Sequence, residues 1–275
     1  MTRAEVLLMR VLSAMGMLLL CLPAPVVART IAVGLYPSYP PLDMRDMRTD
    51  ALEGFDVDLS AALLQRMGMA GRVVETSFAQ LIPSLETGRI QMFFNGMMDT
   101  PARRQSIAFV DYLQSGVQFL TLSDEPHRPL DPQDMCGRMV AASRITSEPA
   151  HLLHWSERIC VARGLPPVVL FAAENSADAR LQLMEGRVVA TLQDSLTAPW
   201  IIARNHGRFR ALGAPFDMAP LGIGLSKDDR DLTCRVQRAL NGLQADGSYL
   251  RLIRKWGLPP ESALPRTSGA LSCPT

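Results

Sequence analysis

Short apolar segments alternate with amphipathic segments along this chain, and the alternation constrains the fold more than any other feature of the sequence. In the first third, residues 30–34, 72–76 and 90–94 are predicted strands, and residues 56–67 and 80–87 are predicted helices. Strands that are connected through helices pair in parallel, and the helices lie on the faces of the sheet. The alternation therefore predicts an α/β fold with a mainly parallel sheet, which binds ligands outside the carboxyl ends of its strands.

The same pattern starts again in the second half of the chain. Predicted strands and helices alternate there as residues 138–142, 146–160, 168–171, 176–185 and 188–192. Residues 221–226 predict a further strand, and the two helices that close the chain need an existing surface to pack on.

We therefore expect two lobes, each with a mainly parallel sheet flanked by helices. The first lobe is predicted to comprise residues 29–115 and 221–275, because the first α/β unit is the natural partner of the closing helices. The second lobe is predicted over residues 116–212, and residues 213–220 are expected to lead the chain back as a return hinge. Two crossing strands, near residues 115–117 and in this return segment, would act as hinges between the lobes.

Residues 1–28 have the layout of a cleavable signal peptide. Arg3 and Arg10 precede an apolar core at residues 11–22, Pro23 interrupts it, and small residues lead up to Ala28. A helix formed by this core would span ~18 Å, whereas a bilayer requires ~30 Å. We expect cleavage after Ala28 and export of the mature chain.

The composition is that of an ordinary globular protein, with 48% apolar and 20% charged residues in a chain of 275. The formal net charge is +1. A balance so close to zero gives no electrostatic reason to expect binding to nucleic acid or to an anionic membrane surface.

Four cysteines follow the predicted cleavage site, and an even number in an exported chain predicts disulfides. Cys136 precedes a predicted strand and Cys160 ends the helix after it, so both lie at the same edge of a βα unit. We predict a bridge between them, and a second one between Cys234 and Cys273. The alternative for the second pair is a buried thiol and an unpaired cysteine in the tail. The spacing fits no zinc site, and no cofactor motif is present.

An anion site is predicted where the third strand of the first lobe ends. Asn95-Gly96 follows the strand, at a place where backbone can approach a ligand closely. Thr100-Pro101 has the pattern of a helix start, and Arg103 lies one turn further on. A guanidinium near a helix N-terminus can hold a carboxylate through two parallel hydrogen bonds. This stretch therefore predicts a carboxylate clamp in a cleft.

Several stretches, taken together and in order, resemble the extracytoplasmic solute-binding proteins of family 3, which serve ABC importers of polar amino acids. The stretches that carry this resemblance are residues 33–42, 52–64, 78–85, 88–103, 109–112, 185–194, 222–229 and 243–257. The resemblance implies a type II periplasmic-binding-protein fold with two lobes and a periplasmic monomer without enzyme activity. It also implies that an amino acid or a related carboxylate is captured and delivered to a membrane permease.

Nine residues are candidates for the ligand site, namely Tyr39, Phe78, Asn95, Gly96, Met98, Arg103, Thr146, Ser147 and Asp194. By resemblance, Arg103 holds the α-carboxylate, and Asp194 takes the α-ammonium with the backbone carbonyl near Gly96. The hydroxyls of Thr146 and Ser147 also meet the carboxylate, and the two aromatic rings sandwich the ligand side chain. A zwitterion in a partly dry cleft needs such a fixed cation and a fixed anion.

The chain departs from the family pattern at three of its positions. Met98 replaces a small hydroxyl residue of the clamp, and Ile145 replaces a glycine before the hydroxyl pair. Tyr36 stands where members that prefer cationic ligands carry an acid, which argues against lysine or arginine as the ligand.

Without the resemblance, the residues alone also allow a plainer explanation for each of these roles. Arg103 would be a surface arginine like its neighbour Arg104, Asp194 an ordinary helix cap, and Met98 part of the packing. Tyr39 and Phe78 would then be core or rim aromatics.

Two other functions fit the same scaffold. One is an enzyme, since relatives of this fold include a periplasmic dehydratase that acts on a cyclohexadienyl substrate. Such chemistry needs a further acid or base in the cleft, and the sequence indicates no spare Glu or His at a cleft edge. The other is a ligand-sensing subunit of a membrane receptor, which nothing in the sequence separates from a transport role.

Overall fold

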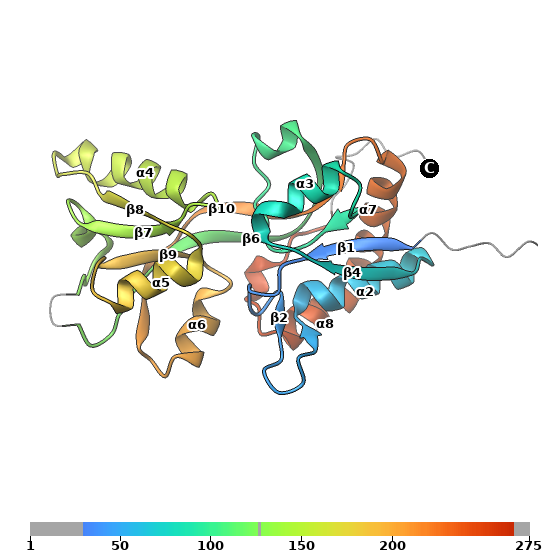
Figure 1. Cartoon of the computed structure of the whole chain (residues 1–275), viewed down its shortest axis with the longest axis horizontal. Coiled ribbons are helices and arrows are strands. Elements are labelled where there is room, and N and C mark those ends of the chain that lie inside the picture. The colour runs from blue at the N-terminus through green and yellow to red at the C-terminus, as the bar shows by residue number, and fades with distance from the viewer. Residues whose placement is uncertain (1–29, 126–127, 267–275) are drawn as a thin grey trace, which may run out of the picture.

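The computed structural model describes residues 30–125 and 128–266, and Figure 1 shows two lobes joined by a pair of long strands. The strands are β1 (Ile31–Leu35), β2 (Met44–Arg45), β3 (Leu52–Glu53), β4 (Gly71–Glu75), β5 (Met92–Phe93), β6 (Ile107–Leu122), β7 (Met139–Ser143), β8 (Val169–Ala173), β9 (Ala190–Asp194) and β10 (Phe209–Ser226). The α-helices are α2 (Phe55–Met67), α3 (Leu81–Glu86), α4 (Glu148–Ile159), α5 (Ser176–Met184), α6 (Ala198–Arg204), α7 (Arg230–Ala245) and α8 (Ser248–Lys255). The predicted signal peptide and Cys273 lie outside the described residues.

One sheet of eight strands runs through both lobes of the described chain, in the order β4-β1-β5-β10-β6-β9-β7-β8. The pairs β1/β4, β1/β5, β7/β8 and β7/β9 are parallel, as expected for strands that are connected through helices. The two central strands, β6 and β10, pair antiparallel with each other and with their outer neighbours β9 and β5. The predicted α/β fold with a mainly parallel sheet in each lobe is therefore confirmed.

β6 and β10 are both longer than the sequence indicated. The crossing strand expected near residues 115–117 extends further in both directions, since β6 runs from Ile107 to Leu122. The segment predicted at residues 213–220 as a return linker lies inside β10. Both segments stay extended because each one pairs with the other across the junction of the lobes, which is a tertiary contact.

The helix that Thr100-Pro101 was expected to start does not form. Arg103–Gln105 is a single turn of 3-10 helix, although the Thr100 hydroxyl accepts the Arg103 N–H at 3.3 Å as a cap would. The Asp99 N–H donates to the Pro220 carbonyl of β10 at 2.9 Å, and the apolar run that follows joins the sheet as β6. Because the residues that follow pair in the sheet, no longer helix forms here. Arg103 therefore lacks the helix dipole that the sequence suggested.

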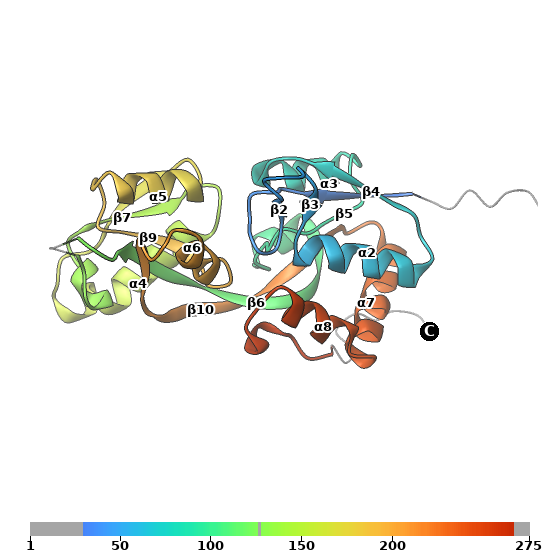
Figure 2. The ribbon, with the colours of Figure 1, turned by 90° about the horizontal axis from the view of Figure 1, so that it is seen from below.

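Helices cover both faces of the sheet in each lobe. Figure 2 shows α3 on one side of the first lobe and α2, α7 and α8 on the other, and α5 and α4 on opposite sides of the second lobe. β1 demonstrates the alternation, since Val33 faces a core that contains Phe55 and Leu59, whereas Ala32 faces a separate core with Leu81. Packing of helices on both faces of the sheet thereby fixes the strand ends at the junction of the lobes.

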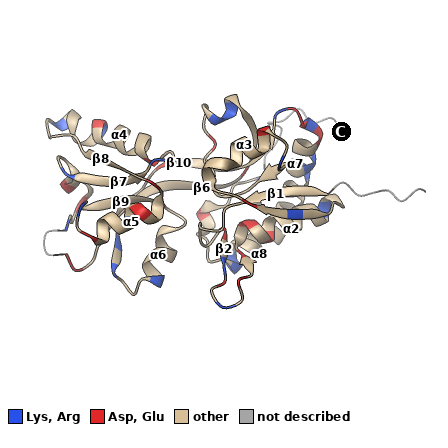
Figure 3. Cartoon of the chain, viewed as in Figure 1, with Lys and Arg blue, Asp and Glu red and all other residues tan. Residues whose placement is uncertain are grey.

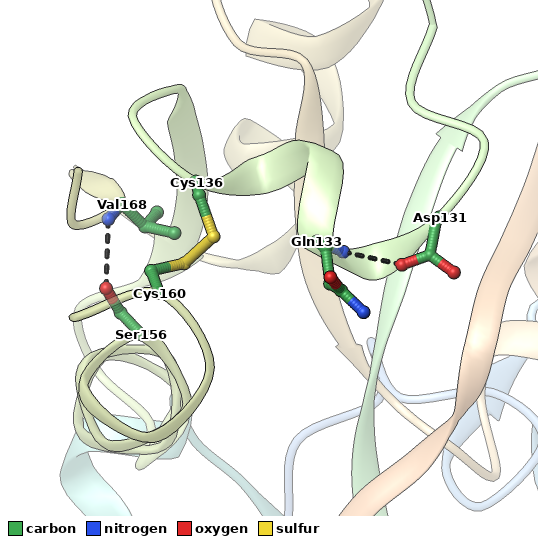
Figure 4. The surroundings of a disulfide bond; sticks show 6 residues. All are labelled: Asp131, Gln133, Cys136, Ser156, Cys160 and Val168. Carbon is green, nitrogen blue, oxygen red and sulfur yellow. Dashed lines mark hydrogen bonds between the residues drawn. A yellow bond between two sulfur atoms is a disulfide. The ribbon is translucent and has the colours of Figure 1, made fainter. Parts of the chain in front are cut away.

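The predicted bridge between Cys136 and Cys160 is present, with an S–S distance of 2.01 Å and a Cα–Cα distance of 5.5 Å. Figure 4 shows it where the end of α4 meets the segment before β7, next to a hydrogen bond of 2.9 Å from the Val168 N–H to the Ser156 hydroxyl. Closing a loop of this length stabilises a fold by about 3.5 kcal/mol in the chain-entropy account. The second predicted bridge includes Cys273, outside the described residues.

Basic and acidic residues are interspersed along the ribbon of both lobes, as Figure 3 shows. None of the helices in the two described ranges is both long and apolar enough to cross a membrane.

Candidate functional site

All nine candidate residues line one cavity of about 220 Å³ between the lobes. The first lobe contributes Tyr39, Phe78, Asn95, Gly96, Met98 and Arg103, and the second contributes Thr146, Ser147 and Asp194. Eight of the residues come from the connections that follow β1, β4, β5 and β7, and Asp194 is the last residue of β9. The carboxyl ends of parallel strands from both lobes thus meet at one place, as expected for α/β sheets.

Arg103 is held in position by its own loop and by an aromatic ring. Its Nη1 donates to the Met98 carbonyl at 2.8 Å, and its Cζ lies 5.8 Å from the centroid of the Phe78 ring. Burial lowers the pKa of the guanidinium, and the nearby charge of Asp99 opposes this shift. The side chain stays cationic, because a guanidinium deprotonates only far above neutral pH. Arg103 is therefore a fixed cation with further N–H donors in the cavity wall.

Asp194 is the buried anion of the opposite lobe. Its Oδ1 accepts the Leu196 N–H at 2.8 Å, and it ends β9 next to the junction of the lobes. Burial raises the pKa of its carboxyl, and hydrogen bonds from Ser115, Leu196 and Tyr39 oppose that shift. Tyr39 belongs to the opposite lobe, so its hydroxyl and the Asp194 carboxyl influence each other across the cavity. Burial and the charge of Asp194 raise the pKa of the Tyr39 hydroxyl, which keeps it a donor.

The Asn95-Gly96 turn is built on buried polar groups. Asn95 has φ 145° and Gly96 has φ 56°, and a Cβ on Gly96 would lie 2.3 Å from the ring of Tyr39. The Asn95 Nδ2 donates to Asp43 Oδ2 at 2.7 Å, and the Gly96 N–H donates to the Tyr112 hydroxyl at 3.1 Å. Only glycine combines this backbone conformation with so close a ring. The carbonyls of this turn are the groups free to approach a ligand.

The scaffold behind this turn contains two carboxyl groups that the sequence did not indicate. Asp43 and Asp56 are fully buried, and the Tyr112 hydroxyl donates to Asp56 Oδ2 at 2.9 Å. Burial raises the pKa of Asp43 to about 7 and also raises the pKa of Asp56, with the charge of Asp43 adding to the second shift. Asp56 stands in the first turn of α2, where a carboxylate is usually a solvated cap, so its sequence position gave no sign of this burial.

The hydroxyl pair of the second lobe is engaged with protein groups. Thr146 Oγ1 donates to the Ser143 carbonyl at 2.9 Å, and Ser147 Oγ donates to the sulfur of Met98 at 3.2 Å. The helix that was predicted from Thr146 begins two residues later, at Glu148. Thr146 and Ser147 therefore lie on the turn before the helix, facing the cavity.

Two charged residues of the cavity wall, Glu148 and Arg180, were missed. The expectation that no spare acid lies in the cleft is wrong, because Glu148 lines the cavity and is only 6% exposed. Burial raises the pKa of its carboxyl to about 8, against the opposing hydrogen bond from the Ser143 N–H at 2.9 Å. Its place directly after the hydroxyl pair was the available signal. Arg180 lies on α5, and the direction in which its side chain points depends on how that helix packs on the sheet.

The described residues contain no group of three or more His, Cys, Asp or Glu that could hold a metal ion.

Known proteins resemble this chain over most of its length. The arginine-binding protein ArgT of Corynebacterium glutamicum is 29% identical to it over 83% of this chain and 74% of that protein. A crystal structure of a mutant of ArgBP from T. maritima superimposes with a TM-score of 0.72 at 29% identity, covering 83% of this chain and 95% of that one. The ancestral amino-acid-binding protein AncCDT-1, a precursor of cyclohexadienyl dehydratase, gives a TM-score of 0.70 at 27% identity over 82% and 95% of the two chains.

These likenesses confirm the two-lobed, type II periplasmic-binding-protein fold. The family model of the bacterial extracellular solute-binding proteins, family 3, matches residues 31–259. Because this match extends over nearly all of the described chain, the protein belongs to that family.

Proposed function

We propose that this protein captures an amino acid, or a carboxylate like one, between its lobes and delivers it to the membrane permease of an ABC importer. One observation carries the proposal: Arg103 of the first lobe and Asp194 of the second line the same cavity. A ligand that carries both a carboxylate and an ammonium satisfies both charges at once. A ligand with only one of these groups leaves a buried charge unpaired, which is costly.

The two charges couple ligand binding to the closing of the lobes. Arg103 binds the carboxylate through two parallel hydrogen bonds, and Asp194 with the carbonyl near Gly96 takes the ammonium. Each lobe holds only half of the clamp, so the full binding free energy is available only when the lobes close over the ligand. Tyr39 and Phe78 flank the rest of the ligand as apolar walls.

The names of the relatives support the ligand class. ArgT and ArgBP are named for arginine, and AncCDT-1 is named as an amino-acid-binding protein. We also propose that the protein acts as a monomer in the periplasm after cleavage of residues 1–28. The lobes would comprise residues 29–115 with 221–275 and residues 116–212, with residues 213–220 as the return hinge.

Glu148 supports a second candidate function, an enzyme on the same scaffold. A buried carboxyl with a pKa of about 8 is suited to hold a proton near neutral pH and to transfer it. AncCDT-1, which is described as a precursor of a dehydratase, shares the fold. We prefer the binding function, because the clamp formed by Arg103 and Asp194 recognises a zwitterion and needs no chemical step to do so.

A thermal-shift screen of the purified protein tests both candidates. The panel should contain the standard amino acids, L-citrulline and carboxylates that lack an amine. A ligand at 100 times its Kd should stabilise the protein by about 2.7 kcal/mol. Stabilisation only by carboxylates without an amine would contradict the zwitterion clamp. Conversion of a stabilising compound, followed by NMR in the same samples, would favour the enzyme.

A further inference from the structure

Arg180 is a second cation in the cavity wall, and it comes from the lobe opposite Arg103. It lies on α5 and lines the cavity together with Glu148 and Asp194. Its Nη1 donates to Gln193 Oε1 at 2.9 Å, and Gln193 is itself buried in β9. The guanidinium is therefore held in place by the sheet of its own lobe.

Most of the hydrogen-bonding capacity of Arg180 is unused by the protein. Within the described residues, the bond to Gln193 is the one hydrogen bond that its side chain makes, whereas a guanidinium has five N–H donors. Burial lowers the pKa of the side chain, which shows that the cation is partly withdrawn from water. A cation that is partly withdrawn from water and has unused N–H donors is stabilised by a hydrogen-bond acceptor, most strongly by an anionic one.

Glu148 interacts electrostatically with Arg180 and opposes the lowering of its pKa, but within the described residues no hydrogen bond or ion pair joins Arg180 to Glu148 or to Asp194. Asp194 accepts the Leu196 N–H, and in the proposed clamp its charge meets the ligand ammonium. Glu148 Oε2 accepts the Ser143 N–H, and burial raises the pKa of this carboxyl to about 8, so that it holds a proton at neutral pH. The wall thus contains two arginines and two carboxyl groups, and each of these carboxyl groups already accepts a backbone N–H.

We propose that Arg180 binds the end of the ligand side chain, and that the ligand is an amino acid whose side chain ends in a hydrogen-bond acceptor, a carboxylate or a carbonyl. This inference rests on the proposed function, because it places the α-carboxylate on Arg103 and the ammonium on Asp194. A cationic side chain would instead meet a like charge at Arg180. The ligand preference would thus differ from the arginine in the names of ArgT and ArgBP.

Isothermal titration with matched ligands tests the inference. L-citrulline and L-arginine have equal length and differ in the end group, a neutral ureido group with a carbonyl oxygen in the first and a guanidinium in the second. We expect L-citrulline to bind at least tenfold more tightly than L-arginine, and L-glutamine or L-glutamate to bind more tightly than L-lysine. Tighter binding of L-arginine than of L-citrulline would overturn the inference and leave the proposed function intact. If no amino acid and no carboxylate of the thermal-shift panel binds, the proposed function fails as well.

Two arginine variants test whether Arg180 itself causes the ligand preference. Arg180→Met should weaken binding of the best acceptor ligand at least tenfold and abolish the preference over L-arginine. Arg187→Met is the matched control, because Arg187 is exposed, donates to Gln182 Oε1 at 2.8 Å and pairs with Glu185 at 3.0 Å outside the cavity. Equal affinities of the two variants would overturn the role of Arg180. If Arg180→Met does not fold, the comparison of citrulline with arginine on the unaltered protein still decides the ligand class.

Discussion

The Ser147 hydroxyl donates a hydrogen bond of 3.2 Å to the sulfur of Met98, and the two residues lie on opposite lobes. A thioether is a weak acceptor, whereas a carboxylate is a strong one. In the proposed complex, Ser147 would exchange this weak contact for a charge-assisted bond to the ligand. In that proposal, Met98 would be the partner that a bound carboxylate replaces.

Ser147→Ala should weaken ligand binding about tenfold, since a hydrogen bond to a charged group contributes about 1.5 kcal/mol or more. Met98→Leu is the matched comparison, because it removes the sulfur and keeps the buried volume. Affinity within threefold of the unaltered protein is expected for Met98→Leu in isothermal titration. A loss as large in Met98→Leu as in Ser147→Ala would mean that the contact between the lobes, and not the bond to the ligand, is what matters.

Arg103 and Arg104 are adjacent, and only the first lines the cavity. Arg104 is exposed and forms an ion pair with Asp99. Arg103→Ala should lower the affinity at least 30-fold, because breaking a desolvated charge pair costs about 2 kcal/mol or more. Arg104→Ala should leave it within threefold, while the melting temperatures show that both variants are folded. Equal losses would remove the carboxylate role from Arg103.

The order of strands and helices was predictable from the sequence, because hydrophobic periodicity and helix caps are local signals. Val33 and Leu59, for example, stand at positions whose spacing alone indicates a buried face. The full lengths of β6 and β10 were not predictable, since each strand is extended by pairing with the other. At Thr100-Pro101 the local signal was the same for a 3-10 turn and for a longer helix, and the sheet decided between them.

The residues of the candidate site were predictable to a different degree. Asp194 ends β9 and Arg103 lies in the connection between β5 and β6, both near the carboxyl ends of strands, where the topology of an α/β sheet places ligand groups. Glu148 is the first residue of α4 and Arg180 lies in the second turn of α5, so the direction in which each side chain points depends on the rotation of its helix on the sheet. That rotation is set by packing with residues far away in the sequence, which local patterns do not contain.

Stability should fall as the pH rises from about 5 to 8. The pKa of Glu148 is raised from an ordinary 4.5 to about 8, and that of Asp43 from 3.8 to about 7, both mainly by burial. Between the ordinary and the raised values, the folded protein holds protons that the unfolded chain has released, so each further pH unit disfavours folding. One fully shifted group changes the free energy of unfolding by about 1.4 kcal/mol per pH unit.

Urea denaturation at a series of pH values measures this dependence. Glu148→Gln should make the slope shallower, because an amide does not ionise and its oxygen can still accept the Ser143 N–H. Glu157→Gln is the control, since Glu157 is an exposed residue of the same helix, outside the cavity. A stability that increases between pH 5 and 7.5, or an unchanged slope in Glu148→Gln, would contradict the assignment of the proton to Glu148.

Asp194→Asn separates the ammonium role from a structural one. The amide oxygen can still accept the Leu196 N–H, so the loop after β9 should keep its conformation and only the charge is lost. The best amino-acid ligand should then bind at least 30-fold more weakly, because its ammonium loses its buried counter-ion. The α-hydroxy acid with the same side chain should lose less than threefold, since it has no ammonium.

Asp178→Asn is the control. It removes a carboxylate of the same lobe that accepts the Glu174 N–H outside the cavity, and it should leave both affinities unchanged. Equal losses for the amino acid and the hydroxy acid in Asp194→Asn would show that this carboxylate holds the site together and does not recognise the amine.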